Sequence, residues 1–129
     1  MANNGILFVM PVLRTPDYTK LAYDSFVANT DMSRHKLVIG LDLDVPEDKI
    51  FYEKNSIPFE VFEGWGHTGM ACYSIMEEKE DTFDYIGLIH NDMVFGYDWL
   101  KDFDRFCVEF PEKSTNSVFC TNLGSIYNG

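Results

Sequence analysis

The sequence has few basic residues and no long hydrophobic run. Its 129 residues include 10 lysines and arginines against 21 aspartates and glutamates, which gives a formal net charge of −11 at pH 7. Binding to nucleic-acid phosphates needs clustered lysine and arginine, so no nucleic-acid partner is expected. No stretch approaches 18 consecutive apolar residues, so no membrane span is predicted.

Cysteine is also scarce, and the first residues lack the features of a secretory signal peptide. Cys72, Cys107 and Cys120 make an odd number without the spacing of a metal-binding motif. These features favour a reducing compartment, and we therefore expect a cytoplasmic protein. Hydrophobic residues make up 46% of the chain, which is too many for a disordered protein.

Short apolar runs alternate with amphipathic segments, a pattern typical of an α/β protein whose mostly parallel sheet is flanked by helices. The length fits a single domain over residues 1–129. Strands are expected at 6–12, 36–41, 58–63, 85–89 and 117–121. Helices are expected after Thr15, over 48–55, after the glycine-rich loop 64–69, and from Asp98 to the proline at 111, with Thr15 and Asp98 as capping residues.

Polar or glycine-rich segments follow four of these predicted strands. They are Arg14 with Thr15, Asp42 with Asp44, the loop 64–69, and the tripeptide 90–92. In open α/β sheets, ligands bind beyond the carboxyl ends of the strands. Loops after strands are polar in proteins generally, so a single polar loop does not indicate a site. The prediction of a binding site rests on the convergence of four such segments.

The tripeptide His90-Asn91-Asp92 follows an apolar strand and combines an imidazole, an amide and a carboxylate. On an extended segment the first and third side chains face the same side, so His90 and Asp92 could share one metal ion. Mg²⁺ prefers oxygen ligands, whereas Mn²⁺ also accepts imidazole. The alternative is that His90 makes a structural hydrogen bond and Asp92 caps a turn.

Asp42, Asp44 and Arg14 each have a binding and a non-binding interpretation. Either acid could accept hydrogen bonds from a base or a ribose, or both could lie in a solvated acidic loop. Arg14 could contact a diphosphate, because a guanidinium forks onto phosphate oxygens, or it could form a surface salt bridge. The glycines at 64–69 have neither the dinucleotide-binding nor the P-loop spacing.

Taken in order, these segments resemble the nucleotide-binding half of a glycosyltransferase of family 2, with a GT-A fold. The family's first strand ends in P-x-x-N, and here Pro11 is present while Arg14 replaces the asparagine. Its second strand ends in a base-reading acid, which corresponds to Asp42 or Asp44. Its N-x-G before a helix is similar to the segment ending at Gly69.

The family's D-x-D motif after an apolar strand is similar to His90-Asn91-Asp92, with histidine in place of the first acid. The resemblance implies a Rossmann-like, hexosyltransferase-type enzyme that transfers a sugar from a nucleoside diphosphate sugar to a glycan, lipid or protein acceptor. It implies Mn²⁺ or Mg²⁺ bound by Asp92, with His90 as the second candidate ligand. The residues expected to contact the nucleotide sugar are Pro11, Val12, Arg14, Asp42, Asp44, Gly69, Asn91 and Asp92.

The resemblance does not identify a catalytic base. Asp98 and Asp104 are candidates only as acids downstream of the metal motif, and family members usually continue well beyond residue 129. The chain is therefore expected to be a fragment, a minimal donor-binding domain or half of an assembly. Two alternatives stay open: a non-catalytic module of the same fold, and a nucleotidyltransferase, which usually needs a glycine-rich basic loop after the first strand.

Overall fold

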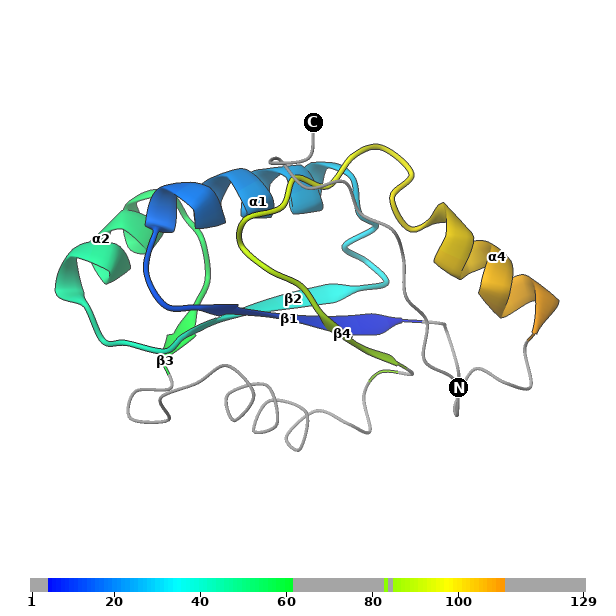
Figure 1. The fold of residues 1–129 in the computed structure, drawn as a ribbon, viewed down its shortest axis with the longest axis horizontal. Coiled ribbons are helices and arrows are strands. Elements are labelled where there is room, and N and C mark those ends of the chain that lie inside the picture. The colour runs from blue at the N-terminus through cyan, green and yellow to red at the C-terminus, as the bar shows by residue number, and fades with distance from the viewer. Residues whose placement is uncertain (1–4, 62–82, 84, 111–129) are drawn as a thin grey trace.

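In the part of the chain that the structure describes, the strands run in one direction and the helices lie along one face of the sheet (Figure 1). The computed structural model describes residues 5–61, 83 and 85–110. Within these ranges four parallel strands have the order β3-β2-β1-β4. The strands are β1 (Ile6–Val12), β2 (Lys36–Leu41), β3 (Glu60–Val61) and β4 (Tyr85–Leu88), and the helices are α1 (Pro16–Ala28), α2 (Pro46–Lys54) and α4 (Lys101–Glu109). The α/β class and the parallel sheet are confirmed.

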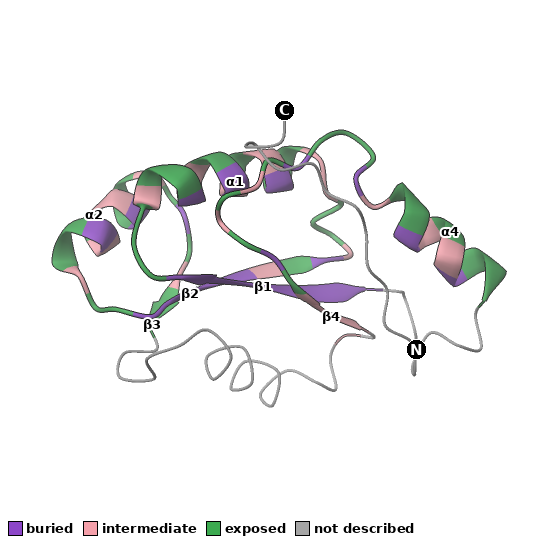
Figure 2. Ribbon diagram, viewed as in Figure 1, coloured by how far each residue is buried: buried purple, intermediate pink, exposed green. Residues whose placement is uncertain are grey.

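Strand β1 lies in the middle of the described sheet and is buried along its whole length (Figure 2). Because side chains alternate across a strand, it supplies two cores. Phe8 and Met10 belong to the larger core with side chains of the three described helices, while Leu7 and Val9 belong to a smaller core on the other face. An apolar run without alternation is expected for a strand buried on both faces.

An aromatic cluster joins β1, α1 and the segment before α4. The ring of Phe26 contacts those of Phe8 and Phe95 at centroid distances of 5.1 and 5.4 Å. Trp99 contacts Phe95 at 4.8 Å and donates its indole N–H to the hydroxyl of Thr30 at 2.8 Å. Edge-to-face pairs of this kind add to the free energy gained from burial. The cluster therefore fixes the segment after β4 against α1.

The first helix begins where the sequence predicts, but Thr15 does not cap it with its side chain. Pro16 occupies the first turn and Asp17 adds an acid there, as expected. Thr15 has φ 63° and ψ 61°, and its hydroxyl donates to the carbonyl of Arg14 instead. A capping residue normally has an extended backbone, so the left-handed conformation explains why the predicted cap is wrong.

The predicted start of the last described helix is also wrong. Helix α4 begins at Lys101, and residues 97–100 form a turn in which Asp98 has φ 58°. The turn places the ring of Trp99 in the aromatic cluster before the helix starts. Helix α2 begins two residues earlier than predicted, because Pro46 suits the first helical position.

The remaining predicted elements agree in part or lie outside the described residues. Strand β2 has the predicted bounds, β4 ends one residue early, and β3 covers only Glu60–Val61 of the predicted 58–63, whose last two residues are not described. The glycine-rich loop 64–69, the helix expected after it and the strand expected at 117–121 lie outside the described ranges. None of the helices in the described part has the length and hydrophobicity that a membrane crossing requires.

Candidate functional site

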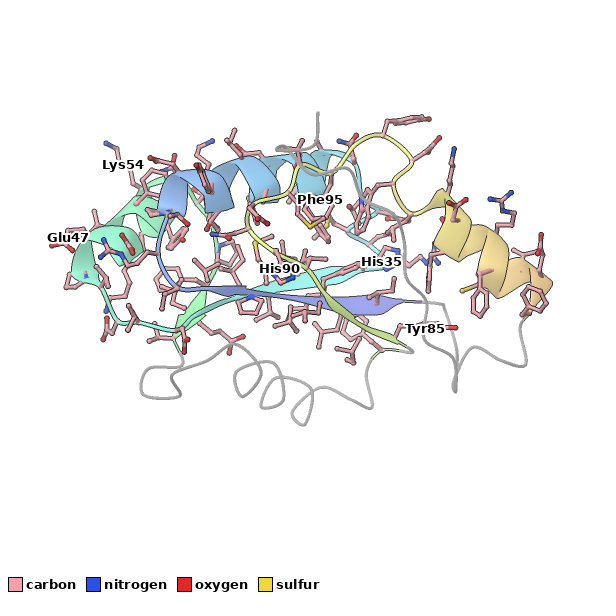
Figure 3. The ribbon with its side chains drawn as sticks, in the orientation of Figure 1. His35, Glu47, Lys54, Tyr85, His90 and Phe95 are labelled. Atoms are coloured by element: carbon pink, nitrogen blue, oxygen red, sulfur yellow. The ribbon has the colours of Figure 1, made fainter. Side chains whose placement is uncertain are left out.

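Three of the four predicted polar segments lie at the carboxyl edge of the sheet. After β1 the chain continues to β2 and β3 on one side of it, and β4 then pairs with its other side. The strand order thus reverses between β1 and β4, the place where open α/β sheets bind ligands. Figure 3 shows His90 on the segment that leads from β4 toward α1.

Asn91 connects the two sides of this reversal. Its side-chain nitrogen lies 3.0 Å from Oγ1 of Thr15 and 3.1 Å from Oγ1 of Thr19, residues in the loop before α1 and in its first turns. The same nitrogen lies 3.5 Å from the carbonyl oxygen of Arg14. The segment after β4 is therefore hydrogen-bonded to the β1–α1 loop.

Arg14 is held from the other side by Asp48 in the first turn of α2. The Nε of Arg14 lies 2.9 Å from Oδ2 of Asp48. The Asp48 side chain is only 9% exposed, whereas that of Arg14 is 55% exposed. The buried carboxylate of Asp48 thus fixes Nε of Arg14, while the Arg14 side chain remains accessible to solvent. This arrangement is suited to binding an anion.

Asp42 and Asp44 have different environments, although the sequence does not distinguish them. The backbone N–H of Asp42 donates to the carbonyl of Val12 at 2.8 Å and extends the β1–β2 pairing. Asp42 is 5% exposed, and within the described part of the chain its Oδ1 is buried without a hydrogen-bond partner. The side chain of Asp44 is 37% exposed and pairs with Lys49.

His90 and Asp92 are both exposed, and the extended geometry expected for them is absent. Strand β4 ends at Leu88, and the chain turns at Asn91 and Asp92. The alternation argument for a shared ligand therefore does not apply. Among the described residues, no three histidine, cysteine or acidic side chains form a group that could hold a metal ion.

This donor set fits Mn²⁺ or Mg²⁺ only with further ligands. Mg²⁺ is commonly bound by one or two carboxylates together with substrate phosphates rather than by an all-protein cage. Asp92, with His90 as the second candidate ligand, has the right chemistry for such a shared site. Phosphate oxygens and water would have to complete the coordination.

Pro11, Val12 and Gly69 complete the predicted contact set. Pro11 and Val12 are buried at the end of β1, and the side chain of Val12 belongs to the larger core. Its carbonyl is already paired with the N–H of Asp42. The two residues shape the edge of the sheet, and Gly69 lies outside the described residues.

Three buried polar residues that are not among the predicted site residues lie next to this edge: Thr19, Asp48 and Tyr52. Burial raises the pKa of the Tyr52 hydroxyl; the nearby Thr19 hydroxyl acts in the opposite direction, and the Asp48 carboxylate adds to the increase. Thr19 follows Thr15 by one helical turn, which was a usable signal. Asp48 is 34 positions from Arg14, and no local pattern links them.

The acids considered as catalytic bases do not join this group. Asp104 pairs with Arg34 at 2.8 Å, in the loop that leads into β2. That loop lies at the amino end of the sheet, opposite the candidate site, as the label of the neighbouring His35 shows (Figure 3). Asp98 lies in the turn before α4.

No protein-family model matches the sequence, and a comparison with curated proteins finds no match. The resemblance to glycosyltransferase family 2 stays a prediction based on the order of the motifs.

Proposed function

We propose that this chain binds a nucleoside diphosphate sugar at the carboxyl edge of its sheet, as the donor-binding domain of a glycosyltransferase. The observation that carries the proposal is the buried carboxylate oxygen of Asp42, which lacks a partner among the described residues. It lies at the end of β2, where the resemblance expects an acid that reads the base.

Burial without a hydrogen bond is costly for a carboxylate. The cost is offset if a ligand donates to Oδ1, and a nucleoside offers such donors on its base and on its ribose hydroxyls. Asp44 has no comparable need because Lys49 neutralises it. We therefore assign the nucleoside contact to Asp42 and not to Asp44.

The remaining polar groups suit the rest of the ligand. The accessible guanidinium of Arg14 is placed to bind phosphate oxygens, and Asp92 is the candidate carboxylate ligand of a divalent ion shared with them. Such an ion would neutralise charge that develops on the leaving phosphate. It also explains how a chain with a net charge of −11 recruits an anionic ligand.

A thermal-shift panel tests the proposal. UDP, GDP, CMP and dTDP are each added with Mn²⁺, Mg²⁺ or EDTA to the wild type and to the Asp42→Asn, Asp44→Asn and Asp92→Asn variants. A ligand at about 100 times its Kd adds about 2.7 kcal/mol of stability, which corresponds to a rise of about 10 °C for a domain of this size.

We expect a metal-dependent shift with one nucleotide that is lost in Asp42→Asn and Asp92→Asn and retained in Asp44→Asn. A shift that survives Asp42→Asn would refute the nucleoside contact. A flat panel with the wild type would refute the donor site.

The exposed turn at His90 and Asp92 favours a second candidate, a non-catalytic module that binds a nucleotide without a metal. The described residues supply no third metal ligand next to this pair. For this candidate the shift with the preferred nucleotide is the same in EDTA as in Mn²⁺, and Asp92→Asn has no effect on it. The same panel thus separates the two functions.

A further inference from the structure

The side chain of Asn91 is already hydrogen-bonded within the protein, although the residue lies between the two candidate metal ligands in the sequence. A side-chain amide has two N–H donors. Thr15 and Thr19 provide acceptors at 3.0 and 3.1 Å. A ligand could use this amide group as a donor only by breaking one of these hydrogen bonds, so the role of Asn91 differs from direct contact.

The loop that Asn91 holds has an unusual backbone. A β-branched residue rarely adopts positive φ, yet Thr15 has φ 63°. Its hydroxyl donates to the carbonyl of Arg14 and accepts from Asn91, whose nitrogen also lies 3.5 Å from that carbonyl. Such conformations persist where surrounding contacts over-determine them. Asn91 supplies those contacts from a segment 76 positions away.

The side chain of Arg14 is fixed by a second residue, Asp48. Asp48 binds Nε at 2.9 Å and is nearly buried, while the Arg14 side chain stays largely exposed. A guanidinium carries five N–H groups, so the pair with Asp48 leaves donors for a ligand. The β1–α1 loop is therefore held at two points: Asn91 holds the hydroxyl of Thr15, the residue after Arg14, and Asp48 holds Nε of Arg14.

We infer that Asn91 is a positioning residue, which fixes the β1–α1 loop so that the guanidinium of Arg14 meets a diphosphate group in a preset orientation. The inference rests on the proposed function for the identity of the ligand. Holding the loop and side chain before binding lowers the entropy cost of ordering them on the ligand. Asn91 acts through Arg14 and does not itself contact the diphosphate.

Asn91 offers a cleaner test than Asp48, because Asn91→Ala leaves the net charge unchanged. Asp48→Asn would remove a negative charge beside the guanidinium and strengthen the attraction for any anion. A loss of affinity in Asn91→Ala cannot have that origin. Asn55→Ala is the matched control, because Asn55 also donates a side-chain hydrogen bond, to the carbonyl of Phe51 at 2.8 Å, away from Arg14.

The experiment follows the arginine Nε–H signals of ¹⁵N-arginine-labelled protein by NMR while inorganic pyrophosphate is added in buffer containing Mg²⁺, because the proposed site binds phosphate groups together with a divalent ion. The chain has three arginines, and Arg14→Gln assigns the signal of Arg14. In the wild type we expect an Arg14 signal that exchanges slowly with water and shifts on titration. In Asn91→Ala we expect faster exchange at Arg14, unchanged signals from Arg34 and Arg105, and about tenfold weaker pyrophosphate binding.

Thr15→Gly provides a second route if Asn91→Ala folds poorly. Glycine tolerates positive φ, and the change removes one acceptor of Asn91, so the Arg14 signal should again exchange faster. The inference is overturned if Asn91→Ala leaves the Arg14 signal and the pyrophosphate affinity as in the wild type, or if pyrophosphate does not bind the wild type.

The nucleotide panel keeps the two proposals distinguishable. If pyrophosphate binding depends on Asn91 while no nucleotide raises the melting temperature, the positioning role stands and the donor-binding function fails. If one nucleotide binds and Asn91→Ala changes neither its affinity nor the Arg14 signal, the donor-binding function stands and the positioning role is overturned.

Discussion

His35 couples the stability of the sheet to pH. The residue is 4% exposed, and its Nδ1 accepts the backbone N–H of Ile6 at 3.0 Å, at the first residue of β1. Burial lowers the pKa of His35 from 6.5 to about 4, and the neighbouring Arg34 acts in the same direction, while Asp104 and Asp31 oppose the shift. A protonated His35 would lose its acceptor and leave the N–H of Ile6 unpaired.

The sign and size of the effect follow from linkage. The folded state favours neutral His35, so its contribution is complete above pH 6.5 and is lost as the pH falls toward 4. At pH 5 the unfolded chain binds the proton and the folded chain mostly does not, which costs about 2 kcal/mol of unfolding free energy. This is a large share of the 5–15 kcal/mol typical of a domain, on the order of a fifth.

The assay is urea unfolding at pH 7.5 and pH 5 for the wild type, His35→Asn and His90→Asn. Asparagine can place an acceptor oxygen near the position of Nδ1 without titrating in this range. We expect the loss of stability between the two pH values to be about 2 kcal/mol smaller in His35→Asn. His90→Asn, the control at an exposed histidine, should match the wild type. Equal losses in wild type and His35→Asn would refute the reasoning.

Three further predictions concern packing and backbone conformation, and each is checked by urea or thermal unfolding. Gly87→Ala should lower the free energy of unfolding by about 1–3 kcal/mol, because a Cβ there would lie 2.7 Å from the ring of Phe8. Gly96→Ala is the control: its Cβ would meet open space, and it should change the free energy of unfolding by less than about 0.5 kcal/mol. Ser56→Gly should raise the free energy of unfolding by about 1 kcal/mol, because Ser56, which follows the C-cap Asn55 of α2, has φ 57°, and an unchanged melting temperature would contradict this. Phe26→Ala should lower the free energy of unfolding by about 3–5 kcal/mol, because the ring is fully buried against Phe8. A smaller loss would show that the surrounding side chains fill the cavity left by the ring.

The strands that form the centre of the sheet could be predicted from the sequence because local composition decides them. The apolar runs at Ile6–Val12 and Lys36–Leu41 match the observed bounds. A chain that alternates such runs with amphipathic helices favours parallel pairing, which places the ends of β1, β2 and β4 at one edge. The neighbourhood of Arg14, Asp42 and Asn91 at this edge follows from these two facts.

The rest depends on contacts between distant residues. The left-handed backbone of Thr15 is held from Asn91, and the late start of α4 follows from the burial of Trp99 against Phe26. Local propensity favours a cap and an earlier helix at these two places, and tertiary contacts override it. The partnership of Arg14 with an acid 34 positions away leaves no local trace for the same reason.

The parallel arrangement also requires contacts that close loops of very different length. The contact of Ile6 with His35 closes a loop of 29 positions, whereas that of Asn91 with Thr15 closes one of 76. The longer closure costs about 0.9 kcal/mol more in chain entropy. During synthesis, β1, α1 and β2 are complete before β4 emerges. The contact of Asn91 with the β1–α1 loop can therefore form only after the segment that follows β4 has emerged, and a ligand bound at the carboxyl edge would stabilise this late contact.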